Sequence, residues 1–333
     1  MLLKVWFYFL NSFAYFALLR NPFIAFLKLV RVENLFIIAI TQVCIKYLVF
    51  APVNAYSDFT PGLFSISLLS TLLIAAAGYI INDYFDVKTD RINRPETVVV
   101  DVSIKRRWAM ILHIVFSATG LLLGIFLALK CHNLKLVTFQ VASILLLWFY
   151  STHFKKQLLA GNLVVSLLTA TIPVMPMVYD FYLSAHSNTL LDSINSAALK
   201  PLVIITLGYS GFAFLTSFAR EVIKDMEDYK GDIQTGCKTM PIVWGIITSK
   251  VVTFFVIVIT AGMLLLAGVK FYYLQQPIAL FYISGLLLLP LTALLVLIIR
   301  AQSSGDFKMA SLLLKFIMLS GIAFTLIIKN LYE

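Results

Sequence analysis

The sequence contains little charge, little cysteine and little histidine. Only 13% of its residues are charged, against the roughly 25% typical of soluble domains, which excludes a soluble globule. With 61% hydrophobic residues it is not a disordered chain either. The cysteines Cys44, Cys131 and Cys237 form no CxxC pair, and the four histidines form no HxxxH pair. Neither a disulfide framework nor a cysteine or histidine metal site is therefore expected.

Long apolar runs are what the sequence has in abundance, and mean hydropathy is +0.94. A run of roughly 17 to 25 apolar residues is long enough to cross a bilayer. The chain is therefore expected to be an all-α polytopic membrane protein. Nine transmembrane helices are predicted, at about residues 33–50, 63–82, 109–129, 134–150, 161–179, 201–219, 247–269, 278–299 and 309–328.

The basic residues divide unevenly between the two sides that these spans define. Nineteen Lys and Arg fall in the N-terminal segment and the connections around 83–108, 151–160, 220–246 and 300–308, and five fall on the other side. Since Lys and Arg mark cytoplasmic loops, the N-terminus and both long connections are expected in the cytoplasm and the C-terminus outside. This asymmetry accounts for the net charge of +10 without nucleic acid as a partner.

The first thirty residues form a separate segment. Residues 2–19 are apolar and follow Lys4, but no A-x-A cleavage site of a signal peptide follows them. We expect residues 1–30 to include a helix in the membrane interface and residues 31–333 to form the transmembrane domain. A tenth span over residues 2–19 is the alternative.

Half of the chain's sixteen acidic residues stand in two short clusters at the cytoplasmic ends of the second and sixth spans. In the first, Asn82, Asp86 and Asp90 recur at intervals of four, so they share one face of a continuing helix. The second contains Glu221, Glu227 and a run with DxxxD spacing, and Gly231 is expected to end its helix and to place the last acid on a loop. Its acids are Glu221, Asp225, Glu227, Asp228 and Asp232.

Two carboxylate stripes at one side of a membrane indicate a cation site. Mg²⁺ takes oxygen ligands, commonly one or two carboxylates with water and substrate phosphates completing its shell. Neighbouring Arg and Lys side chains can bind phosphate oxygens as well. The clusters therefore predict Mg²⁺ and a diphosphate held between the second and sixth spans.

On these residues the sequence resembles the UbiA superfamily of intramembrane prenyltransferases. That family has an NDxxDxxxD motif after its second helix and a DxxxD-containing motif after its sixth. Further matching segments are Arg31-x-x-Asn34, Tyr150-Ser151 followed by Lys155, and Gly236-x-x-Thr239-x-Pro241, and Val32 replaces the usual proline. The ordered set extends over about residues 28–329.

The resemblance implies a nine-helix bundle around a central cavity, with Mg²⁺ as cofactor and an isoprenyl diphosphate as donor. The diphosphate would ionise, and an acceptor would capture the allylic cation. The implied metal ligands are Asn82, Asp86, Asp90, Asp228 and Asp232. The implied diphosphate ligands are Arg94, Lys155, Arg220, Lys224 and Asn34, and the implied catalytic residues are Asp83, Asp225 and Tyr150.

The second motif is most similar to the branch that prenylates geranylgeranylglycerol phosphate, so a lipid acceptor is favoured. A quinone precursor (dihydroxynaphthoate, hydroxybenzoate or homogentisate) is the alternative acceptor, and a secondary transporter is the alternative of another class. Membrane lipids are expected partners, in a prokaryotic inner membrane, and no oligomeric state follows from the sequence. Asp58, Asp180 and Asp192 are expected on the outer side, far from this chemistry.

Overall fold

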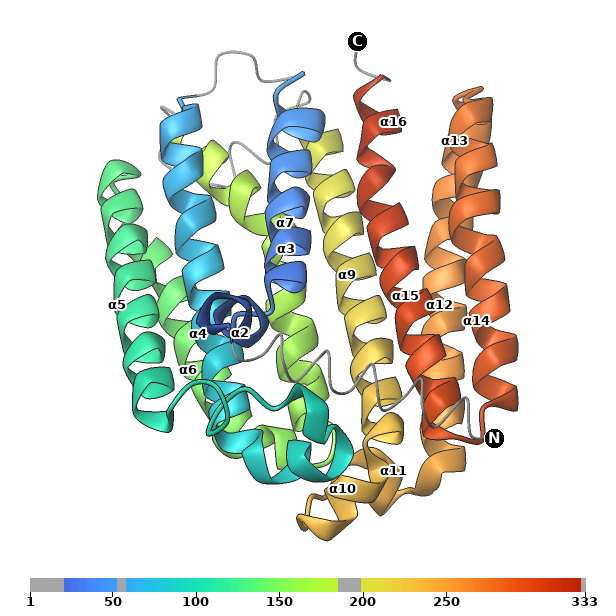
Figure 1. Cartoon of the computed structure of the whole chain (residues 1–333). Coiled ribbons are helices and arrows are strands. Elements are labelled where there is room, and N and C mark those ends of the chain that lie inside the picture. Colours follow the sequence, from blue (N-terminus) through green and yellow to red (C-terminus); the bar gives the residue numbers. More distant parts are fainter. Residues whose placement is uncertain (1–20, 53–57, 185–198, 331–333) are drawn as a thin grey trace.

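The computed structural model describes residues 21–52, 58–184 and 199–330, and in these ranges the chain is a bundle of upright helices (Figure 1). Nine helical segments there are long and apolar enough to cross a membrane, which confirms the predicted spans. Their helices are α3 (Val32–Cys44) with the π-helical η1 (Ile45–Phe50), α4 (Pro61–Asn93), α5 (Arg106–Lys130), α6 (Val137–Thr152), α7 (Ala160–Ser184), α9 (Lys200–Glu227), α12 (Gly245–Tyr273), α13 (Pro277–Tyr282) with η5 (Ile283–Leu288) and α14 (Leu289–Arg300), and α15 (Ser304–Ala323) with α16 (Thr325–Lys329).

Two of these helices continue well past their apolar segments. α4 runs on to Asn93 and α9 to Glu227, so most residues of the acidic motifs stand on helices, as expected. The prediction for Asp232 was wrong. Gly231 does not end a helix: α9 stops at Glu227, and Gly231 and Asp232 lie inside the short helix α10 (Tyr229–Gln234).

Small residues bring the helices together. A Cβ on Gly120 of α5 would lie 2.7 Å from Ile74 of α4, and the Ser70 hydroxyl donates to the Gly120 carbonyl at 2.7 Å. Close approach at glycines is typical of membrane helices, since apolar surface gains little from leaving lipid and contact must come from fit. α4 thus packs along α5, and α7 along α9.

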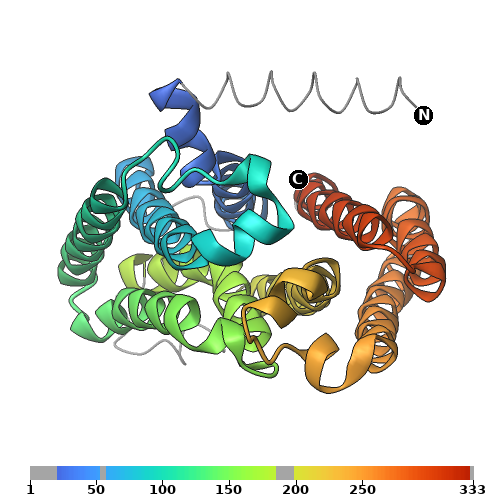
Figure 2. The ribbon, with the colours of Figure 1, turned by 60° about the horizontal axis from the view of Figure 1, so that its bottom comes forward.

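Short elements cover the end of the bundle that carries the motifs (Figure 2). These are η2 (Pro95–Thr97), η4 (Phe154–Lys156), α10 and α11 (Met240–Val243). Helix α2 (Pro22–Leu29) is seen end-on in Figure 1 while the spans stand upright, so its axis is roughly perpendicular to the spans and does not extend one. Residues 1–20, on which the interfacial helix and the tenth span were predicted, lie outside the described residues.

The opposite end contains a buried ion pair that the sequence did not indicate. Lys46, in the π-helical turn η1, donates to Asp180 of α7 at 2.6 Å, and the two side chains are 6% and 0% exposed. Asp180 is therefore a packed interior residue rather than part of an outer loop. Asp58 is exposed, and Asp192 falls outside the described residues.

Candidate active site

The acidic motifs meet at one end of the bundle. Asn93, the last residue of α4, donates from Nδ2 to the Asp228 carbonyl at 3.2 Å and accepts at Oδ1 from the Gly231 amide at 2.9 Å. A Cβ on Gly231 would stand 2.3 Å from Asn93 Oδ1, so only glycine fits this approach. Segments about 140 residues apart are thereby joined by one side chain that bonds to two backbone groups.

Arg94 connects the two motifs through its side chain. One guanidinium nitrogen donates to Asp228 Oδ1 at 2.8 Å and Oδ2 at 3.0 Å, and it lies 3.1 Å from Glu227 Oε1. Burial works against the charged guanidinium, but Asp228 and Glu227 outweigh it, so the pKa of Arg94 is raised. The group is a permanent cation in contact with the second motif.

Lys155 stands between the carboxylates from the other side. The 3₁₀ turn η4 that follows α6 carries it, and its ammonium is paired with Asp86. Burial opposes the charge, yet Asp86 and Asp90 raise the pKa of Lys155 above its ordinary value. The backbone of the next residue, Lys156, accepts from the Lys238 amide at 2.9 Å, which ties this turn to the segment after α10.

Asp232 is a buried carboxylate outside the spans. It is 6% exposed, and burial raises its pKa to about 6. Lys155 lowers that pKa, whereas Asp228 and Asp86 raise it further. One carboxyl group thus interacts electrostatically with both motifs.

The predicted metal ligands form an all-oxygen donor set of a kind suited to Mg²⁺. Asn82 and Asp86 are 7% and 6% exposed, and Asn82 Oδ1 is buried without a hydrogen-bond partner. Over residues 21–52, 58–184 and 199–330, no three acidic, His or Cys side chains are already gathered closely enough to hold a metal. The donors fit a hard cation, with Lys155 and Arg94 now paired to two of them.

Arg31 was not among the predicted site residues, and the structure pairs it with Asp83 at 2.7 Å. Its φ of 50° and ψ of 57° put it in the left-handed region, which is uncommon for a residue with a side chain. This conformation turns the chain from α2 into α3. The guanidinium also lies 5.3 Å from the ring centre of Tyr79. The signal available in the sequence was the Arg31-x-x-Asn34 match.

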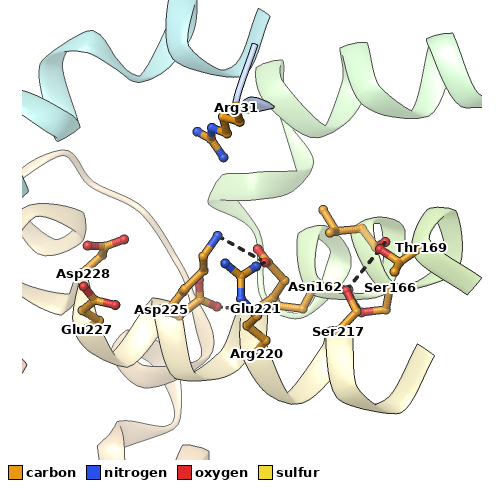
Figure 3. A network of polar contacts seen from close by, with 12 residues as sticks. Arg31, Asn162, Ser166, Thr169, Ser217, Arg220, Glu221, Asp225, Glu227 and Asp228 are labelled. Atoms are coloured by element: carbon orange, nitrogen blue, oxygen red, sulfur yellow. Dashed lines mark hydrogen bonds and ion pairs between the residues drawn. The ribbon is translucent and has the colours of Figure 1, made fainter. Parts of the chain in front are cut away.

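The last turns of α9 carry a second polar network (Figure 3). Glu221 Oε1 is 3.3 Å from the Lys224 ammonium and 3.5 Å from Arg220, and Asp225 accepts from Asn162 of α7 at 2.8 Å. Asn162 was not among the predicted site residues, and its one signal in the sequence is an amide near the start of an apolar span. Arg220 and Lys224, predicted as diphosphate ligands, share one carboxylate.

A cavity of about 260 Å³ extends from this network into the bundle, enclosed by α3, α4, α6, α7, α9 and α15. Its walls away from the motifs are largely apolar, with Ile37, Ile74 and Leu168 among them. The predicted site residues that line it are Asn34, Asn82, Tyr150, Arg220 and Lys224. Asp83, Asp86, Asp90, Arg94, Lys155, Asp225, Asp228 and Asp232 are outside its lining, toward the end of the bundle.

Comparison with known sequences gives consistent matches. The sequence profile of the UbiA prenyltransferase family matches residues 43–319. The digeranylgeranylglyceryl phosphate synthase of Sulfolobus acidocaldarius is 30% identical over 306 residues, 91% of this chain and 97% of that protein. The synthase of the same name from Sulfurisphaera tokodaii is 32% identical over 276 residues, 83% of this chain and 87% of that protein.

Comparison with solved structures shows the same fold. A UbiA homologue from Archaeoglobus fulgidus, solved with DMAPP and Mg²⁺, superposes with a TM-score of 0.55 at 14% sequence identity. The match covers 90% of this chain and 98% of that one.

Proposed function

The chain belongs to the UbiA prenyltransferase family and is a membrane prenyltransferase, and we propose that it prenylates geranylgeranylglycerol phosphate from an isoprenyl diphosphate. The observation that carries the proposal is that both acidic motifs meet beside a largely apolar cavity in the bundle. Charged groups suit a diphosphate and apolar walls suit its isoprenyl chain, whose burial is favourable by roughly 0.8 kcal/mol per CH₂.

In this reaction the bond between the allylic carbon and the diphosphate oxygen breaks, and the electron pair leaves with the diphosphate. The acceptor hydroxyl oxygen forms the new C–O bond and loses its proton. Mg²⁺ bound by Asn82, Asp86, Asp90, Asp228 and Asp232 would neutralise the departing diphosphate. Support for these ligands comes from their oxygen chemistry and from the unpartnered Asn82 Oδ1.

The chain's own cations bind the phosphate oxygens of the donor. Lys155 and Arg94 contact Asp86 and Asp228, so they are already at the carboxylates that the metal requires. When those carboxylates turn to a metal, the two cations become available to the diphosphate. Arg220, Lys224 and Asn34 bind it from the cavity side.

The remaining predicted residues act on the cation and on the acceptor. Tyr150 lines the cavity, where its ring face can stabilise an allylic cation. Asp225, held by Asn162, is the carboxylate proposed to take the acceptor's proton. Asp83 holds Arg31 near the same cavity. Apolar walls exclude the water that would otherwise trap the cation.

Two relatives with a name that specifies a glyceryl phosphate product favour this acceptor over a quinone precursor. Family membership favours an enzyme over a secondary transporter. For the membrane, we propose a prokaryotic inner membrane with the motif end in the cytoplasm, on the basis of the distribution of Lys and Arg.

The test is a prenyl-transfer assay on purified protein in lipid, with products detected by mass. Geranylgeranyl diphosphate and Mg²⁺ are supplied with geranylgeranylglycerol phosphate or with each aromatic acceptor. We expect a Mg²⁺-dependent ether product with the glycerol phosphate only. Asp86→Asn and Asp228→Asn should each reduce turnover by roughly 100-fold or more, whereas Asp58→Asn, at the opposite end, should not. Prenylation of an aromatic acceptor instead would overturn the proposed acceptor.

A further inference from the structure

Lys315 is a charged residue deep in the last span. It stands eleven residues beyond Ser304, the start of α15, which is about 16 Å along a helix axis. From Met309 to Ala323 it is the only charged residue. An ionised side chain at this depth is costly and is a marker of function in membrane helices.

The side chain of Lys315 belongs to the cavity wall. Lys315, Met318 and Ile322 recur at helical spacing along one face of α15, and all three line the cavity together with Arg31 and Arg220. The Lys315 side chain is 23% exposed. Most of the side chain is therefore covered by protein, and the residue forms part of the cavity wall.

The ion pair that Lys315 makes in this structure is a weak one. Its Nζ donates to Glu33 Oε2 of α3 at 2.8 Å, but the Glu33 side chain is 82% exposed. Ion pairs with exposed carboxylates contribute little to stability. The pair joins the first and last spans, which contact each other. Stability alone does not account for a lysine here.

The cavity lining carries more positive than negative charge. Arg31, Arg220, Lys224 and Lys315 face one lining carboxylate, Glu221. Arg220 Nε is buried and has no hydrogen-bond partner. An anionic headgroup with an apolar tail matches such a lining, since phosphate oxygens accept from both ammonium and guanidinium groups.

The donor's diphosphate has other proposed ligands. Lys155 and Arg94 are outside the cavity lining, and Asn34, Arg220 and Lys224 line it from α3 and α9. Lys315 is on α15, a different helix from all five. We infer that Lys315 binds the phosphate of the lipid acceptor at the seam between α3 and α15 and releases the Glu33 carboxylate in exchange. This inference rests on the proposed function and names the residue that selects a phosphate-bearing acceptor.

The experiment measures KM for both substrates in Lys315→Met, a substitution that keeps the length of the side chain and removes its charge. KM for geranylgeranylglycerol phosphate should rise about 10- to 100-fold, the worth of a charge-assisted hydrogen bond. KM for geranylgeranyl diphosphate should stay unchanged, which also reports a folded enzyme. Lys315→Arg should restore acceptor binding. Lys308 is an exposed lysine near the start of the same helix, and Lys308→Met is the matched control.

Glu33→Gln separates ligand binding from a structural bridge. If Lys315 binds the acceptor, removing the competing carboxylate lowers KM for geranylgeranylglycerol phosphate. If the pair only fastens α3 to α15, Glu33→Gln and Lys315→Met raise that KM alike, and the inference is wrong. An unchanged acceptor KM in Lys315→Met, with prenylation intact in the unmodified protein, overturns it as well and leaves the proposed function standing.

A failure of the proposed function is recognised separately. If the unmodified protein prenylates no acceptor, binding of radiolabelled geranylgeranylglycerol phosphate is measured directly, beside uncharged geranylgeranylglycerol. Tighter binding of the phosphate form that Lys315→Met abolishes supports the site without the reaction. Equal binding of the two lipids by the unmodified protein overturns it.

Discussion

In each acidic motif a carboxylate is paired with a Lys or Arg side chain of the same chain. Asp86 contacts Lys155 and Asp228 contacts Arg94. Acids on one helix face repel each other unless a cation is near, and here side chains supply it. A metal-bound diphosphate contains cations and anions. The metal can therefore pair with Asp86 and Asp228, and the phosphate oxygens can pair with Lys155 and Arg94. In the proposed reaction the site would thus keep its charge balance with and without substrate.

At this scale we predict that Lys155→Met weakens binding of the donor. The variant loses a charge-assisted contact to phosphate, so the Kd for geranylgeranyl diphosphate with Mg²⁺ should rise about 10- to 100-fold in calorimetry. Lys156→Met is the matched control, because that side chain is adjacent and exposed. Equal affinities in the two variants would remove Lys155 from the site.

Among the elements, the contact of α4 with α10 decides whether the motifs form one site. Asn93 makes both of its hydrogen bonds to backbone atoms of the second motif. Those bonds need the Asn93 side chain to lie against the backbone of α10, which the absent Cβ of Gly231 permits.

Gly231→Ala should therefore destabilise the protein by about 1–3 kcal/mol, as overpacking does, and weaken Mg²⁺-dependent donor binding. The control is Gly208→Ala on α9, where a Cβ would meet nothing within 4 Å. Thermal unfolding and donor titration of both variants are the measurements. A Gly231→Ala protein with unaltered Tm and affinity would show that the contact is dispensable.

The Lys46–Asp180 ion pair joins η1 to α7, and a second prediction at the scale of elements follows from it. Lys46→Met removes the ammonium that pairs with this buried carboxylate, which should cost about 3–5 kcal/mol. The double variant Lys46→Met/Asp180→Leu should recover most of that loss, because no buried charge remains. The unmodified protein, Lys46→Met and the double variant are compared by their Tm in detergent. A double variant less stable than Lys46→Met would contradict this prediction.

For the whole molecule, the uneven distribution of basic residues predicts which end faces the cytoplasm. The native cysteines Cys44, Cys131 and Cys237 are buried, so they give little background to a thiol reagent. A membrane-impermeant maleimide applied to intact cells should label Tyr273→Cys, at the far end of α12, and not Lys230→Cys beside the motifs. Permeabilised cells should label both, and the reverse pattern would invert the topology.

The sequence by itself determined the spans and the helical character of most motif residues, whereas its assignment of site residues stays a prediction. Those features are local: hydropathy over some twenty residues decides what enters a bilayer, and a spacing of four decides which side chains share a helix face. The match of motifs in order added the family, and relatives then supported the acceptor.

Only the tertiary structure decided which groups meet. Arg31 with Asp83, Asn162 with Asp225 and Lys315 at the cavity are contacts between helices far apart in the chain. Such contacts depend on how closely and at what angle helices pack, and small residues set this without any local pattern in the partners. The prediction for Asp232 was wrong for the same reason. The preceding residue, Gly231, contacts Asn93 of another helix and does not end its own helix.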